Sequence, residues 1–253
     1  MTISMMLGAL PLAGQVGIDC ADVPRHGAVR TALKAVVSAG GNGGLSNDMW
    51  ATVVNRDGVV CAVAFSGDDR GDQWLASRVI SAQKANTANS LSLPTGEGGA
   101  VPGLSLSTAN LFSAVQPGGS LFGLQFSNPV DTGVAYKGPA SRFGRPNDPM
   151  RGRAIGGVNV FGGGFALYDS SGEVVGGLGV SGDTSCTDSN VAWKVRDMLA
   201  LDNVPAGVSA TGDDNIINDI VDGVSAGGFG HPACDDTATA VAADLPNTNP
   251  IGP

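Results

Sequence analysis

Two pairs of apolar runs, each pair joined by a short polar turn, constrain the fold of this chain most strongly. In the first pair, residues 50–54 and 59–65 flank Asn55-Arg56-Asp57-Gly58, whose Asp-Gly step favours the positive backbone angles of a tight hairpin. In the second pair, residues 158–168 and 173–180 flank Asp169-Ser170-Ser171-Gly172. Two β-hairpins predict an antiparallel sheet.

Four other segments have the apolar spacing of helices that could pack on such a sheet. We expect helices over 24–39, 74–91 and 104–115, and a fourth that begins with Thr187 or Asp188 as its cap. Strands and helices together indicate the α/β (α+β) class. We expect an antiparallel sheet of about five strands with flanking helices.

Composition and charge exclude several classes of protein. The chain has 253 residues, and its 39 Gly and 14 Pro are too many for a helical bundle. A formal net charge of −9, with only 14 Lys and Arg, disfavours nucleic acid and anionic membranes as partners. No run reaches the roughly 20 apolar residues of a membrane helix, so we expect no membrane span.

The chain is expected to form one domain over 23–201. Residues 117–153 are rich in Pro, Gly and Asn, and we interpret them as a loop insertion that covers a pocket or an oligomer contact. Residues 202–253 form an irregular acidic tail, and its last part, 235–253, is expected to be disordered.

Residues 1–22 are expected to precede the folded domain. Residues 5–14 resemble the apolar core and small-residue end of a signal peptide, but the basic residues that should precede them are missing. Two interpretations therefore stay open, a signal remnant and a disordered extension of the domain.

The four cysteines, Cys20, Cys61, Cys186 and Cys234, match no zinc-site spacing. We prefer disulfides Cys20–Cys61 and Cys186–Cys234, because each would tie a flanking segment to the sheet. Four cysteines allow three pairings, and four buried free thiols are the alternative. Disulfides would place the protein outside the cytoplasm, in a periplasm or secreted.

Two glycine-rich stretches invite functional interpretations. Gly177-Leu178-Gly179-Val180-Ser181-Gly182 has the spacing of a dinucleotide-binding fingerprint, but it follows the second arm of a hairpin rather than opening a helix in a parallel unit. Glycines that permit close packing on the sheet are the favoured interpretation. At Gly162-Gly163-Gly164-Phe165, bare backbone could approach a flat ligand, or the strand could simply bend.

Of the two histidines, His26 is the candidate for metal ligation. His26 could bind a metal or haem iron through a neutral imidazole, or it is an ordinary residue of its helix. His231 is expected in a loop, and Asp183 and Asp188 could bind a cation, although a helix cap also explains Asp188. There is no Gly-x-Ser-x-Gly elbow, and the sequence identifies no catalytic residue.

A series of motifs in fixed order resembles one known family. These are the turn Asn55-Arg56-Asp57-Gly58, the helical run 82–88, the pair Gly163-Gly164 and the strand 175–182. Together they resemble the haem-degrading family that groups the glycolate-operon G protein, HbpS and the C-terminal domain of PduO. The resemblance covers residues 24–200, with 117–153 as an insertion.

The resemblance implies a profilin-like or PAS-like fold that assembles into homo-oligomers, from dimers up to octamers. It also implies a haem cofactor, or another small planar or organic ligand. His26 is the one residue here that matches the first-helix histidine that ligates haem in PduO-type relatives. The other cofactor-binding residues implied by the resemblance are Lys84, Gly163, Gly164 and Phe165.

Two departures from the family pattern leave the ligand open. Gly67-Asp68-Asp69-Arg70 stands where many members have Arg-Met-Asp-Gly, and Phe165-Ala166 follows the glycine pair where others have a proline. Three hypotheses follow. The protein binds and handles haem by storage, sensing or slow degradation; or it is an enzyme or accessory protein acting on a small organic acid or aldehyde; or it is an oligomeric scaffold with no ligand.

Overall fold

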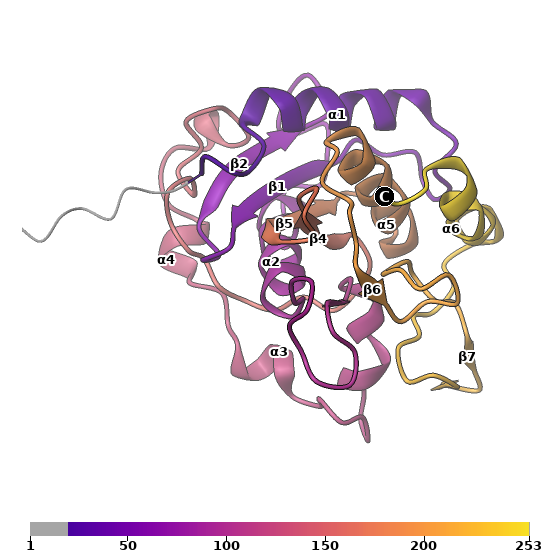
Figure 1. Cartoon of the computed structure of the whole chain (residues 1–253). Coiled ribbons are helices and arrows are strands. Elements are labelled where there is room, and N and C mark those ends of the chain that lie inside the picture. The colour runs from indigo at the N-terminus through magenta and orange to yellow at the C-terminus, as the bar shows by residue number, and fades with distance from the viewer. Residues whose placement is uncertain (1–19, 253) are drawn as a thin grey trace, which may run out of the picture.

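The computed structural model describes residues 20–252, and its centre is an antiparallel sheet of four strands (Figure 1). Both predicted hairpins form, and their inner strands pair with each other so that Trp50 lies opposite Ser181. Residues 158–163 are not part of the second hairpin, which begins at Gly164. The strands are β1 (Trp50–Asn55), β2 (Val60–Phe65), β4 (Gly164–Tyr168) and β5 (Val174–Ser181), in the order β2-β1-β5-β4.

Helices cover both faces of the sheet, so the strands are buried on each side. Ala51 and Val53 pack with α1 (His26–Ala39) and α5 (Ser185–Met198), whereas Trp50 and Val54 pack on the other face with α2 (Ser77–Ser90). Figure 1 shows α1 and α2 on opposite sides of the sheet. This three-layer arrangement is a mixed helix and sheet fold, as predicted.

The glycines of β5 bring α2 close to the sheet. A Cβ at Gly177 would clash with the carbonyl oxygen of Ala85, and one at Gly179 would clash with that of Ser81. Both carbonyls belong to α2. The glycine spacing that resembles a dinucleotide fingerprint therefore serves close packing of a helix on a strand.

The segment 104–115 was predicted as a helix, and this was wrong. It contains β3 (Leu104–Ser105), which pairs in parallel with β6 (Ala206–Gly207), and then two 3₁₀ turns. The side chain of Asn110 accepts hydrogen bonds from the backbone N–H and the hydroxyl of Ser107, a local pattern that competes with helix formation. The turns are η1 (Ala109–Leu111) and η2 (Ser113–Val115).

The ends of the other helices differ from prediction by a few residues. The cap of α1 is Arg25, so Pro24 lies outside the helix. The cap of α5 is Thr184 rather than Thr187 or Asp188, and the Thr184 hydroxyl accepts a hydrogen bond from the backbone N–H of Thr187.

The insertion 117–153 is mostly irregular, as expected, and its end covers an edge of the sheet. The Gly152 N–H donates to the Val60 carbonyl at 2.8 Å, and the Val60 N–H donates to the Arg153 carbonyl at 3.0 Å. The first residue of β2, an edge strand, is thereby paired with the insertion. Its short helices are α3 (Leu124–Ser127), α4 (Thr132–Ala135) and the 3₁₀ turn η3 (Ala140–Arg142).

The acidic tail is more ordered than predicted. Disorder over 235–253 was wrong, because α6 (Asp236–Thr248) packs on α5 and buries Ala238, Ala242 and Leu245. The carboxylate of Asp235 caps this helix by accepting from the Ala238 N–H at 2.7 Å. Before α6, a small hairpin joins β7 (Ile220–Val221) and β8 (Val224–Ser225).

Both preferred disulfides are present. Cys20 pairs with Cys61, which ties the segment before α1 to β2, and Cys186 pairs with Cys234, which ties the tail to α5. Over residues 20–252, none of the helices has the length and apolarity to cross a bilayer. The predicted signal remnant falls outside the described residues, apart from its last few positions.

Candidate functional site

His26 lies at an open pocket of about 730 Å³ beside the start of α1. This volume falls within the range of roughly 300–1,000 Å³ that small-molecule sites occupy. The lining combines apolar groups with two cations: Pro24, Arg25, His26, Cys61, Pro146 and Arg151.

The insertion supplies one wall of this pocket, and a buried ion pair holds that wall in place. Arg78 donates two hydrogen bonds to the carboxylate of Asp148, one of them from Nε to Oδ2 at 2.9 Å. Both side chains are almost fully buried. The same carboxylate accepts the backbone N–H groups of Gly144 at 2.7 Å and Met150 at 2.9 Å. The segment 144–151 is therefore positioned by a residue of α2.

The hydrogen bond of His26 decides which ring nitrogen can bind a ligand. Nε2 lies 2.9 Å from the carbonyl oxygen of Gly144. A carbonyl oxygen only accepts, so Nε2 carries the proton and the neutral ring has its lone pair on Nδ1. Nδ1 has no hydrogen-bond partner among the described residues. The half-buried imidazole is thus held in one orientation with one nitrogen available.

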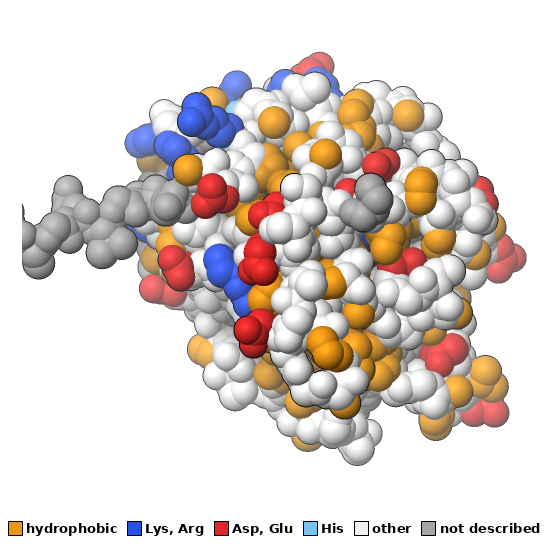
Figure 2. All heavy atoms as spheres, viewed as in Figure 1, with side chains coloured by type: hydrophobic (Ala, Val, Ile, Leu, Met, Phe, Trp, Pro, Cys, Tyr) orange, Lys and Arg blue, Asp and Glu red, His pale blue; other side chains and the backbone are white. Residues whose placement is uncertain are grey.

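Positive charge gathers around this histidine, although the chain as a whole is acidic. Arg25 and Arg151 are exposed at the pocket, and Arg151 Nε donates to the Cys61 carbonyl at 3.2 Å. A neighbouring hollow is lined by Arg70 and Arg145 together with one carboxylate, that of Asp69. Figure 2 shows a group of Lys and Arg side chains on the part of the surface where α1 begins in Figure 1. Together with the positive end of the α1 dipole, it favours a ligand with carboxylate groups.

Lys84 does not line this pocket but lies inside the protein. Its Nζ is 2.7 Å from an Asp188 carboxylate oxygen, 3.0 Å from the Val180 carbonyl oxygen and 4.7 Å from the centroid of the Phe161 ring. Burial lowers the pKa of Lys84, and burial raises the pKa of Asp188 to about 6. The pair links α2 to α5 and is enclosed.

Gly163, Gly164 and Phe165 also lie in the interior. Phe165 is fully buried and packs edge-on against Trp193, with ring centroids 5.8 Å apart. A Cβ at Gly163 would meet the Val180 carbonyl and the Asp188 side chain, and one at Gly164 would meet Lys84 and Thr108. The glycines therefore let the strand pass between helices. The structure does not bring these three residues or Lys84 to His26, and it leaves no room for a flat ligand beside them.

Asp183 and Asp188, the two candidate cation ligands, accept hydrogen bonds from backbone N–H groups. Asp183 accepts from the N–H groups of Leu45 and Asn47, both at 2.9 Å, and so anchors the glycine-rich loop after α1. Asp188 accepts from the N–H groups of Gly182 and Asp183 in addition to Lys84. These contacts give both carboxylates a structural role that requires no bound cation.

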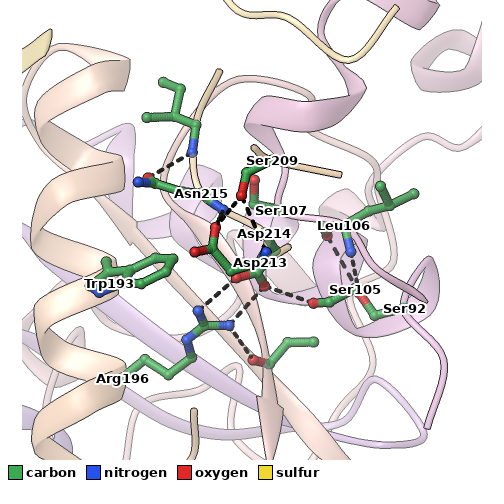
Figure 3. Close-up of polar contacts among 12 residues, drawn as sticks. Ser92, Ser105, Leu106, Ser107, Trp193, Arg196, Ser209, Asp213, Asp214 and Asn215 are labelled. Atoms are coloured by element: carbon green, nitrogen blue, oxygen red, sulfur yellow. Dashed lines mark hydrogen bonds and ion pairs between the residues drawn. The ribbon is translucent and has the colours of Figure 1, made fainter. Parts of the chain in front are cut away.

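A third buried ion pair joins two residues that the sequence did not mark as candidates (Figure 3). Arg196 binds Asp214 through two hydrogen bonds of 2.8 and 2.7 Å, and Ser105 donates to the same carboxylate at 2.7 Å. The network joins the tail to α5 and β3. Both ions are fully buried, so neither is in contact with solvent. In the sequence, Asp214 stands in an acidic stretch that is typical of a solvated tail.

Comparison with known proteins identifies a family. Residues 26–196 match the family model described as "Haem degrading protein HbpS-like". No sequence among curated proteins matches the chain significantly.

Several solved structures are similar. The PduOC–heme complex is 21% identical with a TM-score of 0.44, over 68% of this chain and 89% of that chain. The Klebsiella pneumoniae protein ORFY, of family DUF336, is 25% identical with a TM-score of 0.43, over 68% and 88%. HbpS is 15% identical with a TM-score of 0.41, over 72% and 94%.

Proposed function

This chain belongs to the HbpS-like family of haem-degrading proteins, and on that premise we propose that it binds haem in the His26 pocket. One observation carries the proposal: His26 holds a free Nδ1 at an open pocket that two arginines flank. Storage, sensing and slow degradation of haem all require this binding step.

The residues of the pocket fit the chemistry of haem. A neutral imidazole nitrogen is a common axial ligand of haem iron, and His26 Nδ1 is such a group. The two propionates need cationic partners, and Arg25 and Arg151 are exposed at the pocket. Pro24, Pro146 and the disulfide at Cys61 offer apolar surface to the macrocycle. Haem, when bound, would supply a redox-active iron, and the chain's own residues bind and orient it.

We propose a location outside the cytoplasm, which the two disulfides favour. We also propose that the protein is a homo-oligomer. Phe122, Phe126 and Tyr136 support this, because they are 59%, 77% and 65% exposed on the insertion. Mass measurement by light scattering is the test, and a monomer in solution would contradict oligomerisation and with it the scaffold hypothesis.

The decisive experiment is a haem titration followed by the Soret absorption band. We expect saturable binding to the wild type, and loss or a shift of the band in His26→Ala, because the axial nitrogen is removed. His231→Asn is the matched control, since it changes the chain's other histidine, which is buried away from this pocket.

An unchanged band in folded His26→Ala would contradict ligation by His26. No band beyond that of free haem in the wild type would overturn haem binding altogether. The same arginines would then favour the small organic acid of the second hypothesis, to be sought by mass spectrometry of the purified protein.

A further inference from the structure

The loop before α6 brings a histidine to the Cys186–Cys234 disulfide. One ring nitrogen of His231 and the two sulfur atoms all lie within 4.8 Å of one another. Among the described residues this is the one cluster of His, Cys, Asp or Glu close enough to hold a metal ion. Cys186 comes from the first turn of α5, whereas His231 and Cys234 come from the tail.

The hydrogen bonds of His231 resemble those of a metal-binding histidine. Its Nδ1 lies 2.7 Å from the carbonyl oxygen of Pro232, so Nδ1 carries the proton and Nε2 has the lone pair. Metal-binding histidines usually donate their other N–H to a carbonyl or carboxylate in this way. The backbone N–H of Gly162 reaches Nε2 at 3.4 Å, a long hydrogen bond that competes little. The ring is 2% exposed.

The two sulfurs differ in the ways that reversible reduction requires. Cys234 is exposed, so an external thiol can reach it, whereas Cys186 is buried. The N-terminal turn of a helix stabilises a thiolate, and Cys186 occupies that turn of α5. In addition, the backbone N–H of Cys186 points to Cys234 Sγ at 3.2 Å. Both sulfurs would therefore be stabilised as thiolates.

We propose that reduction of Cys186–Cys234 creates a redox-gated Zn²⁺ site, with two cysteine sulfurs and His231 as protein ligands and a fourth position open to water. A dithiol reductant supplies two electrons and two protons, breaks the S–S bond and leaves as its own disulfide. Zn²⁺ then replaces the two thiol protons, which are released to solvent. Two cysteines, a histidine and one open position match a known class of zinc site. In the oxidised protein both sulfurs are bonded to each other and no site exists.

The test uses Co²⁺ as a spectroscopic probe for Zn²⁺. The purified chain is reduced, freed of reductant and titrated without oxygen, beside the oxidised chain. We expect thiolate-to-cobalt absorption bands that saturate at one Co²⁺ per reduced chain and are displaced by Zn²⁺, with no bands in the oxidised chain. His231→Asn should weaken binding at least tenfold, and Cys186→Ser/Cys234→Ser should abolish the bands.

A further control separates the two disulfides. Cys20→Ser/Cys61→Ser removes the other pair of sulfurs and should leave the cobalt bands in place. Reduced wild type without thiolate bands would overturn the proposal, as would equal affinity in His231→Asn. Loss of the native circular dichroism spectrum on reduction would overturn it as well, because the ligands come together only in the folded chain.

Discussion

The His26 pocket and the interior around Lys84 place similar groups in opposite surroundings. Arg25 and Arg151 are exposed, and neither is within ion-pair distance of a carboxylate in the described part of the chain. Lys84 is fully buried and held by Asp188. A buried charge needs a fixed partner, so it serves the stability of the fold. An exposed charge has no such requirement and can bind a ligand. The resemblance to the family joined the two regions into one site, and the fold separates them.

The largest effect is expected from breaking the interior ion pair. Lys84→Ala leaves the buried carboxylate of Asp188 without its partner, which should lower the free energy of unfolding by about 3–5 kcal/mol. Denaturant unfolding measures this loss. The double variant Lys84→Met/Asp188→Asn should recover much of it, because no charge is left unpaired and the Asn oxygen can still accept the N–H groups of Gly182 and Asp183. Haem binding per folded chain should not change, and its loss in Lys84→Ala that remains folded would contradict the separation of the two regions.

A smaller effect on the free energy of unfolding is expected from the buried side chain of His231, and this effect depends on pH. The folded pKa of about 4 lies below the ordinary value of 6.5, so the unfolded chain binds more protons between these two pH values. Stability should therefore fall as pH falls from about 6.5 to about 4, by at most about 3 kcal/mol from this group.

Comparison with His231→Gln isolates that contribution. The variant should show a weaker loss of stability over the same range in denaturant unfolding at a series of pH values. Asp188, whose pKa burial raises to about 6, contributes a slope of opposite sign that is present in both proteins. Parallel curves for the two proteins would show that His231 is not buried in its neutral form.

The smallest effects are expected at the exposed arginines of the pocket. Arg25→Ala and Arg151→Ala should each weaken haem binding by about 1 kcal/mol, roughly fivefold, because each removes one partner of a propionate. Added salt should reduce the difference from wild type. Arg153→Ala is the matched control, since Arg153 is exposed on the same segment but does not line the pocket. An equal loss of haem affinity in all three variants would indicate a general effect of net charge rather than two defined contacts.

Local patterns predicted the elements of the central domain well. Apolar runs around a tight turn specify a hairpin through contacts between near neighbours, and both hairpins formed. The preferred disulfides were confirmed. The helix expected over 104–115 failed because Ser107 and Asn110 bond to each other locally, and because Leu104 and Ser105 pair with a strand of the tail. That partner lies about a hundred residues away, where no local pattern indicates it.

The site was predictable in its residue types but not in its arrangement. His26 was identified, and the structure places it at a pocket. The wall opposite comes from the insertion, whose position depends on the buried contact between Arg78 and Asp148, and neither residue has a sequence signature. His231, expected in a loop, is indeed in one, but its burial beside a disulfide was not expected. The spacing of His231-Pro232-Ala233-Cys234 was the available signal.

By itself, the sequence determined the two hairpins and three of the helices around them, because these follow from turn chemistry and periodicity along short stretches. The order of its motifs indicated the family. Only the tertiary structure decided which charged groups are free to act. Lys84 and Arg196 differ from Arg25 and Arg151 in burial, and burial is set by which distant segments pack over a residue. Since a charge inside must be paired while a charge outside need not be, the same residue types support the fold in one region and offer a ligand site in the other.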